Sequence, residues 1–266
     1  MGFFNRASKK TSDQAKPAQG GQAIAMIALS EAAWFDPALL AEEFARFAPK
    51  DPPLLHVSTE GVGLGFELGD LQAVVAQMPA PIPWTDLEGS CAINRLWPEA
   101  TEQMKTHTVH YIVTVFGAAS PLRLRVLLTR LVAAILKVQP CVGVYWGSGL
   151  VHSPERFLKA SERVSEDSFD HTLWIDFRVV PGKRHGLTLL TSGMAEFGLM
   201  EIEAQNARCS HAEMLERVFG LATYLITKGP VINDGETMGL TATDKVGINH
   251  LPSMFPERGL VYQLRF

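Results

Sequence analysis

The segment CVGVYWGSGLVHSPERF, residues 141–157, is the most informative stretch for predicting the fold and its binding surface. It reads as a buried strand over 141–146, a tight turn in which two glycines flank Ser148, and a helix opened by Ser153 and Pro154. A strand that ends in an aromatic pair before such a turn is expected to place side chains at the mouth of a sheet. We therefore predict a binding surface formed by Tyr145, Trp146, Gly147, Ser148 and Gly149.

Around this segment, helices mostly follow single strands and strand pairs follow helices. The predicted order is β-α-β-β-β-α, then β-α-β-α-β-β-β-α-β-β. This order favours the α+β class, with mixed or antiparallel sheets and helices packed on one face, over a parallel doubly wound sheet. The similar order of the two parts suggests two ferredoxin-like halves. We divide the chain into a disordered tail (1–22), an N-terminal half (23–139) and a C-terminal half (140–266), with one joint domain as the alternative.

Two apolar segments carry most of the expected core. Residues 23–29, AIAMIAL, form a continuous apolar run, which is typical of a central strand buried on both faces. Residues 121–138 predict a helix that is apolar nearly all round and is therefore packed on most sides. Arg123, Arg130 and Lys137 recur every seven residues in it, so we expect them to form a single solvated stripe.

The charge of the chain narrows the class of partner. The 266 residues include 24 basic and 28 acidic ones, a net charge of -4. Four basic residues against Asp13 give the first twenty residues a charge of +3, so the remainder carries -7. We expect no nucleic-acid partner, because phosphate binding needs clustered cations. An acidic body is instead suited to capturing a basic partner.

Cysteine and hydropathy patterns bear on the compartment. Cys91, Cys141 and Cys209 are odd in number and include no CxxC pair, which favours a reducing cytoplasm over a disulfide framework or a structural zinc site. No apolar run approaches the roughly 18 residues of a membrane span. The run at 23–29 is too short and too far from the start for a signal peptide. We predict a cytoplasmic protein.

Ser148 is the first candidate catalytic residue. The nucleophile elbow G-x-S-x-G would need glycine where Trp146 and Leu150 stand, so the match is loose. A nucleophilic serine also needs a base and an oxyanion hole. His152, four residues on, is the second candidate, and its simpler interpretation is a hydrogen-bonded histidine.

Two carboxylates complete the candidate set. Asp176 lies between apolar residues with Arg178 on the same strand face, which more often indicates a structural ion pair. Glu196 and Glu201 flank the stretch FGLM. The glycines at 61–65 lack the strand-then-helix context of a dinucleotide loop, and the stretch INDGET at 232–237 lacks EF-hand spacing. We therefore predict no cofactor and no metal site.

Four blocks of sequence point to a family. They are CVGVYWGSGLVHSPERF, LWIDFRVVPG, LTSGMAEFGLMEIEAQ and GPVINDGETMGLTATDKVGINHLPSMF. Together they resemble the bacterial domain-of-unknown-function family 4261 over about residues 140–255. The resemblance implies a bacterial, mostly cytoplasmic, α+β protein. It implies no activity and assigns no catalytic residue.

Three functions follow from these observations. The first is a non-enzymatic binding protein, an adaptor or immunity-type partner of another bacterial protein. The alternative is a small-molecule hydrolase with its site around Trp146, Ser148 and His152, which requires Glu155, Asp176 and Glu196 to converge there. The third is a structural domain of a larger assembly that docks through Phe3 and Phe4 of the tail.

Overall fold

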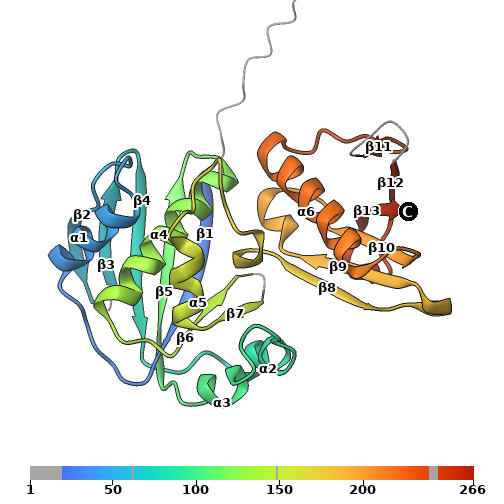
Figure 1. Ribbon diagram of the computed structural model, residues 1–266. Helices are drawn as coiled ribbons and strands as arrows, with labels where there is room; N and C mark the ends of the chain where they lie inside the picture. The colour runs from blue at the N-terminus through green and yellow to red at the C-terminus, as the bar shows by residue number, and fades with distance from the viewer. Residues whose placement is uncertain (1–19, 62, 148, 240–244) are drawn as a thin grey trace, which may run out of the picture.

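The computed structural model describes residues 20–61, 63–147, 149–239 and 245–266, which form two sheets beside one another (Figure 1). Most of the predicted tail, residues 1–19 with Phe3 and Phe4, lies outside the described residues. Gly21 and Gln22, also assigned to that tail, belong instead to the first strand. The α+β class is confirmed.

The first sheet has seven strands, each antiparallel to its neighbours, in the order β2-β3-β4-β5-β1-β6-β7. Its strands are β1 (Gly21–Leu29), β2 (Leu55–Glu60), β3 (Gly63–Leu68), β4 (Leu71–Met78), β5 (Val109–Gly117), β6 (Gly143–Trp146) and β7 (Leu150–His152).

One face of this sheet is covered by α1 (Pro37–Phe47), α4 (Pro121–Val138) and α5 (Pro154–Ser161) (Figure 1). Each of these helices begins with the same local signal. A capping side chain, from Asp36, Ser120 or Ser153, accepts a hydrogen bond from a backbone N–H of the first turn, and proline follows it. Two short helices, α2 (Trp84–Ala92) and α3 (Ala100–Met104), lie at one end of the sheet.

The first sheet contains a ferredoxin-like unit. In chain order β1, α1, β4, β5, α4 and β6 follow the β-α-β-β-α-β pattern, and their strands lie in the order β4-β5-β1-β6. The hairpin of β2 and β3 extends one edge of this unit and β7 extends the other. The ferredoxin-like prediction therefore holds for the first sheet.

The second sheet has the order β11-β12-β13-β10-β9-β8, in which β10 and β13 are parallel and the other pairs antiparallel. One long helix, α6 (His211–Lys228), packs on it, and the described residues of this part of the chain form no second helix of the kind a ferredoxin-like unit has. Its remaining elements are β8 (Asp176–Pro181), β9 (Leu187–Ser192), β10 (Ile202–Ala207), β11 (Thr237–Met238), β12 (Val246–Pro252) and β13 (Leu260–Arg265), with 3-10 turns η1 (His171–Leu173), η2 (Lys183–His185), η3 (Met194–Phe197) and η4 (Pro256–Arg258).

The sheets divide later in the chain than the predicted halves. Because β6 pairs with β1, and β7 with β6, residues 143–152 belong to the first sheet although they were placed in the C-terminal half. The second sheet begins at β8. Sheet membership therefore changes at β8, because strand partners are set by long-range pairing rather than by local pattern. The two-domain division itself stays a prediction.

The two sheets share one hydrophobic core. A single cluster of buried side chains includes residues under both sheets. Trp174, in the connection between them, is fully buried, and its indole N–H donates to Oγ1 of Thr129 in α4 at 2.9 Å. Its ring packs against Phe169 and Phe197, with centroids 5.1 and 5.8 Å away. This indole fastens the second half onto the central helix of the first.

The predicted solvated stripe on α4 is wrong for its two arginines. Asp51, whose side chain is 5 % exposed, accepts hydrogen bonds from both Arg123, at 2.7 Å, and Arg130. Arg130 also donates to the carbonyl oxygen of Val164 at 2.7 Å. Only Lys137 of the three is exposed. The heptad spacing reflects a shared ion-pair partner from the α1–β2 loop, which the helix sequence alone does not reveal.

Candidate functional site

The predicted binding turn lies at the hairpin of β6 and β7. Trp146 is fully buried against Phe157, with ring centroids 6.1 Å apart, so it belongs to the core. Tyr145 and Gly149 are half-buried, and Gly147 is exposed. Ser148 lies outside the described residues. The turn thus offers little apolar surface of its own.

Polar side chains from α2 and from the segment just after it hold this hairpin in place. Ser90 donates to the carbonyl oxygen of Gly149, and Asn94 donates to that of Val151 at 2.7 Å. Gly149 has φ +91°, a conformation that favours glycine. The glycine predicted to make a tight turn here therefore does so.

Glu196, a catalytic candidate from the second half, does reach this turn. A Cβ atom at Gly147 would lie 3.3 Å from Oε1 of Glu196 and 3.4 Å from the carbonyl oxygen of Ile24. Glu196 accepts a hydrogen bond from Nε of Arg125 at 3.3 Å, and the Arg125 guanidinium lies 4.9 Å from the Phe197 ring. The apolar pattern of its helix gives no sign that Arg125 would form an ion pair. The side chain of Arg125 is only 6 % exposed. Glu196 is therefore one half of an ion pair held between the two sheets.

His152 is fully buried in β7. One ring nitrogen, Nε2, lies 3.1 Å from the carbonyl oxygen of Leu173, and the ring packs against Phe157. Burial, reinforced by the Arg156 charge, lowers the pKa of His152 to about 4. The imidazole is therefore neutral near pH 7 and shielded from substrate.

The catalytic candidates have separate partners. Asp176 forms an ion pair with Arg178 at 2.7 Å, with about a third of its side chain exposed. Glu155 is exposed in the first turn of α5. No hydrogen bond joins His152, Asp176 and Glu196 in the described part of the chain. Each instead has a structural partner.

A larger surface lies on the other face of the first sheet. The pairing register places every second residue of β4, β5 and β1 in rows that point away from α1 and α4. Three rows form this open face: Gln72, Phe116 and Gln22; Val74, Thr114 and Ile24; and Ala76, Ile112 and Met26.

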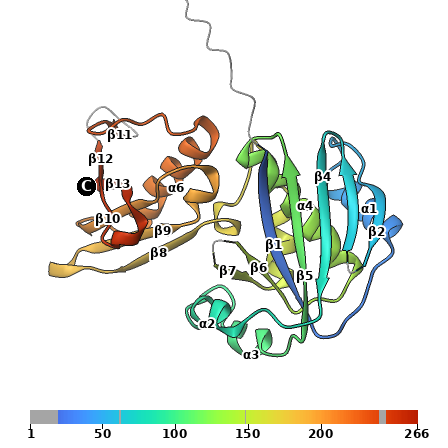
Figure 2. The ribbon, with the colours of Figure 1, turned by 180° about the vertical axis from the view of Figure 1, so that it is seen from behind.

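The centre of the open face is apolar and uncovered. Figure 2 looks onto β1, β5 and β4 with the covering helices behind them. Ile24, Val74, Ile112 and Phe116 are half-buried and pack against neither hydrophobic cluster. Only the end near Met26 and Tyr145 meets α2 and α3. An antiparallel sheet with one solvated face normally alternates apolar with polar residues, so this apolar face is unusual.

The surroundings of the open face carry negative charge. None of the seven strands contains lysine or arginine. Exposed Glu67 lies opposite Gln72 and extends the first row. Asp86 lies close enough to Tyr145 for its charge to add to burial in raising the tyrosine pKa. The face is therefore apolar at its centre and acidic at its rim.

The sequence held a signal for this face. The run at 23–29 predicted burial on both sides of β1. Ala23, Ala25, Ile27 and Leu29 do lie in the core under the helices, and Ala28 is buried in the cluster with α2 and α3, while Ile24 and Met26 point to the open face and are half-buried. The prediction of burial on both faces is therefore wrong for Ile24 and Met26. The same apolar spacing in β4 and β5 is the signal that could have identified the surface.

Two further observations concern metal binding and membrane-spanning helices among the described residues. No three His, Cys, Asp or Glu side chains gather closely enough to hold a metal ion. No helix within the described ranges has the length and apolarity needed to cross a membrane.

These features define an α+β protein with an uncovered apolar sheet face beside a second, mixed sheet. Residues 190–264 match the model of the family described as domain of unknown function DUF4261. The family resemblance is thereby confirmed over a shorter span than 140–255, from within β9 to within β13. No curated protein and no solved structure matches the chain significantly.

Proposed function

We propose that this chain is a non-enzymatic binding protein, an adaptor or immunity-type partner of another bacterial protein, acting in the cytoplasm. The observation that carries the proposal is the open face, an apolar patch that no element of the described chain covers. Patches of this kind on a folded protein mark interaction sites more often than not. The separate, structural partners of His152, Asp176 and Glu196 favour binding over hydrolysis.

The size of the open face suggests a segment of a partner rather than a second copy. Three strands about 4.8 Å apart and three rows about 7 Å apart give roughly 300 Å². A stable interface between two folded proteins buries about 800 Å² on each side. A single extended or helical segment needs less surface, so we assign the open face to such a segment.

The charge of the surroundings specifies the chemistry of that segment. Because Glu67 and Asp86 flank the open face and its strands lack cations, complementarity favours apolar side chains flanked by lysine or arginine. This agrees with the charge of -7 outside the first twenty residues. Nucleic acid is disfavoured by the same lack of cations.

A peptide of alternating lysine and leucine is a direct probe of this proposal. We expect it to bind the full chain, measured by fluorescence anisotropy of a labelled peptide, and to bind at least about tenfold more weakly to Ile112→Glu. Ile112→Ala, which removes apolar area without adding charge, should weaken binding less. Leu39→Glu, at an exposed position of α1 on the other face of the sheet, is the matched control. Circular dichroism melts establish that the variants fold.

Several results would contradict the assignment. Equal affinity for wild type and Ile112→Glu would remove the open face as the site. A homodimer in sedimentation that Ile112→Glu dissociates would make a second copy the occupant. A large gain in peptide affinity on deleting residues 1–19, which carry the basic charge and Phe3 and Phe4, would make that segment the occupant.

A further inference from the structure

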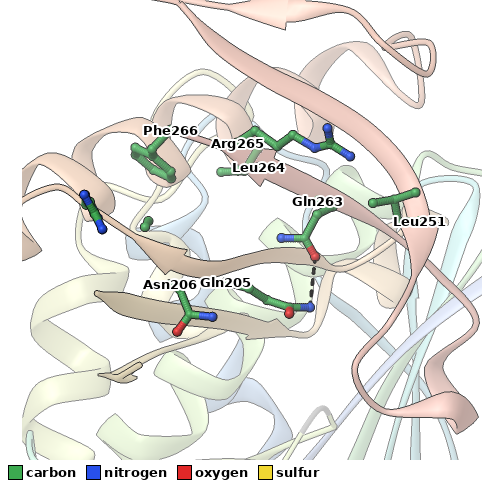
Figure 3. Close-up of a pocket in the computed structure, with 9 residues that line it drawn as sticks. Gln205, Asn206, Leu251, Gln263, Leu264, Arg265 and Phe266 are labelled. Carbon is green, nitrogen blue, oxygen red and sulfur yellow. Dashed lines mark hydrogen bonds between the residues drawn. The ribbon is translucent and has the colours of Figure 1, made fainter. Parts of the chain in front are cut away.

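A second surface, in the DUF4261 part of the chain, differs in chemistry from the open face. The ladder between the parallel strands β10 and β13 stops at Ala204 and Leu264. Beyond this point the strands border an open groove of about 490 Å³ (Figure 3). We call it the arginine groove, and its lining residues are Gln205, Asn206, Ala207, Arg208, Leu251, Gln263, Leu264, Arg265 and Phe266.

A β-bulge shapes the end of β10 at this groove. The pairing of β10 with β9 shifts register between Ala204 and Ala207, and Asn206 adopts φ +52°. The η2 turn fixes the bulge, because the side-chain oxygen of Asn206 accepts a hydrogen bond from the backbone N–H of Lys183. Gly186 packs so closely that a Cβ atom there would lie 2.7 Å from the Asn206 carbonyl group. The bulge is thus a fixed feature of β10, beside the point where its ladder with β13 stops.

The groove carries positive charge on an acidic protein. Arg208 and Arg265 are exposed, and neither forms an ion pair with another described residue. None of the nine lining residues is aspartate or glutamate. Arg217 lies 5.8 Å from the ring of Phe266, but its guanidinium pairs with Glu213 at 3.0 Å, so its charge is balanced there. Guanidinium groups bind carboxylates through paired N–H donors, so the local field selects an anionic ligand.

Side-chain amides and apolar groups supply the rest of the groove. Figure 3 shows Gln205 and Gln263 meeting between the strands, where Nε2 of Gln205 donates to Oε1 of Gln263 at 3.3 Å. Gln263 in turn donates to the carbonyl oxygen of Glu203 at 3.3 Å, so its amide is held in one orientation. Leu251 and Phe266 add apolar surface. Amides suit peptide groups, and apolar lining suits side chains between charges.

We propose that the arginine groove binds an extended acidic peptide segment. Its carboxylates pair with Arg208 and Arg265, its apolar side chains contact Leu251 and Phe266, and its main chain meets the strand ends where the ladder has stopped. The ligand is opposite in charge to the segment proposed for the open face, and the two proposals stand on different residues.

A peptide of alternating glutamate and leucine tests the groove in the full chain. We expect it to bind, to lose about fivefold in affinity with Arg208→Gln or Arg265→Gln, and to lose more with both. Arg265→Lys keeps the charge but loses the paired donors, so its loss should be smaller. Arg163→Gln makes the same charge change at an exposed position outside the groove and is the matched control. Added salt should weaken binding.

The competitors decide the ligand class. Inorganic phosphate and acetate at equal concentration should displace little peptide, because they lack the apolar and main-chain contacts. Full displacement by phosphate would make the groove a simple anion site and overturn the peptide assignment. Equal affinity of wild type and the double arginine variant would overturn the site itself. The lysine–leucine peptide should bind all these arginine variants equally well, so failure here and failure at the open face are distinguishable.

Discussion

The open face of the first sheet and the arginine groove of the second oppose each other in charge. The first is made of strands without a single cation and has Glu67 and Asp86 at its rim. The second has two arginines and neither aspartate nor glutamate among its lining residues. A net charge of -4 describes neither surface. The chemistry of a partner therefore depends on the local charge and exposure of each surface, which the net charge of the chain does not reveal.

The largest expected effect concerns the core that joins the two regions. Trp174→Ala should lower the free energy of unfolding by about 3–5 kcal/mol, because a fully buried indole and its hydrogen bond to Thr129 are lost. The shared core predicts that both sheets lose protection together in hydrogen exchange. Leu96→Ala, 64 % exposed, should change stability by less than about 0.5 kcal/mol. Loss of protection in only one sheet would show that the two regions are energetically independent.

The second effect is a pH dependence at the same junction. His152 has a pKa of about 4 in the folded protein against 6.5 as the ordinary value, so folding favours its neutral form. Above about pH 6.5 the neutral imidazole contributes roughly 3 kcal/mol to the free energy of unfolding. This contribution is lost as the pH falls towards 4. Urea unfolding measured across this range should show the decline.

Other buried histidines should also lower the stability as the pH falls, so a matched variant is needed to isolate the effect of His152. Burial also lowers the pKa of His110 and His171. His152→Gln keeps a neutral donor near Leu173, should be less stable above pH 6.5, and should show a flatter decline below it. An unchanged slope would assign the pH dependence to the other histidines.

A third prediction separates the two surfaces through backbone shape. Gly186→Ala should cost about 1–3 kcal/mol, because the new methyl group meets the backbone of Asn206. The displaced bulge should weaken binding of the acidic peptide while leaving the lysine–leucine peptide unaffected. Gly220→Ala, where a methyl group meets no atom within 4 Å, is the control. Equal binding of the acidic peptide would mean that the bulge does not shape the groove.

The smallest effect concerns the rim of the open face. Glu67→Lys should weaken binding of the lysine–leucine peptide about threefold, because an exposed charge contributes less than about 1 kcal/mol. Salt should reduce the difference between variant and wild type. Glu162→Lys makes the same change near the end of α5 and should have no effect. A salt-independent loss would indicate altered structure rather than lost attraction.

Much of the fold was predictable because its signals are local. The helix predicted to open at Ser153 and Pro154 and the apolar helix predicted over 121–138 are observed as α5 and α4. The strand-rich order fixed the α+β class. The boundary at 139/140 was not predictable in this way, since pairing of β6 with β1 joins residues more than a hundred positions apart.

The candidate site was predictable only in part. Tyr145 and Gly147 do lie near the edge of the open face, but Trp146 turned inward because its strand position faces α4 and α5. Arg125 was hidden in an apolar helix, and its role as the partner of Glu196 required the second half to dock there. Charged pairs across such distances leave no spacing pattern in the sequence.

Local sequence patterns were enough to predict most helices and strands, the class of fold and the acidic character of the chain, because each depends on neighbouring residues or on a sum. Tertiary contacts settled which side of β1 stays uncovered, where the bulge at Asn206 shifts the pairing of β10 with β9, and which arginines pair with carboxylates. Those outcomes depend on register and on contacts between distant segments, where shifting a strand by one residue exchanges its two faces.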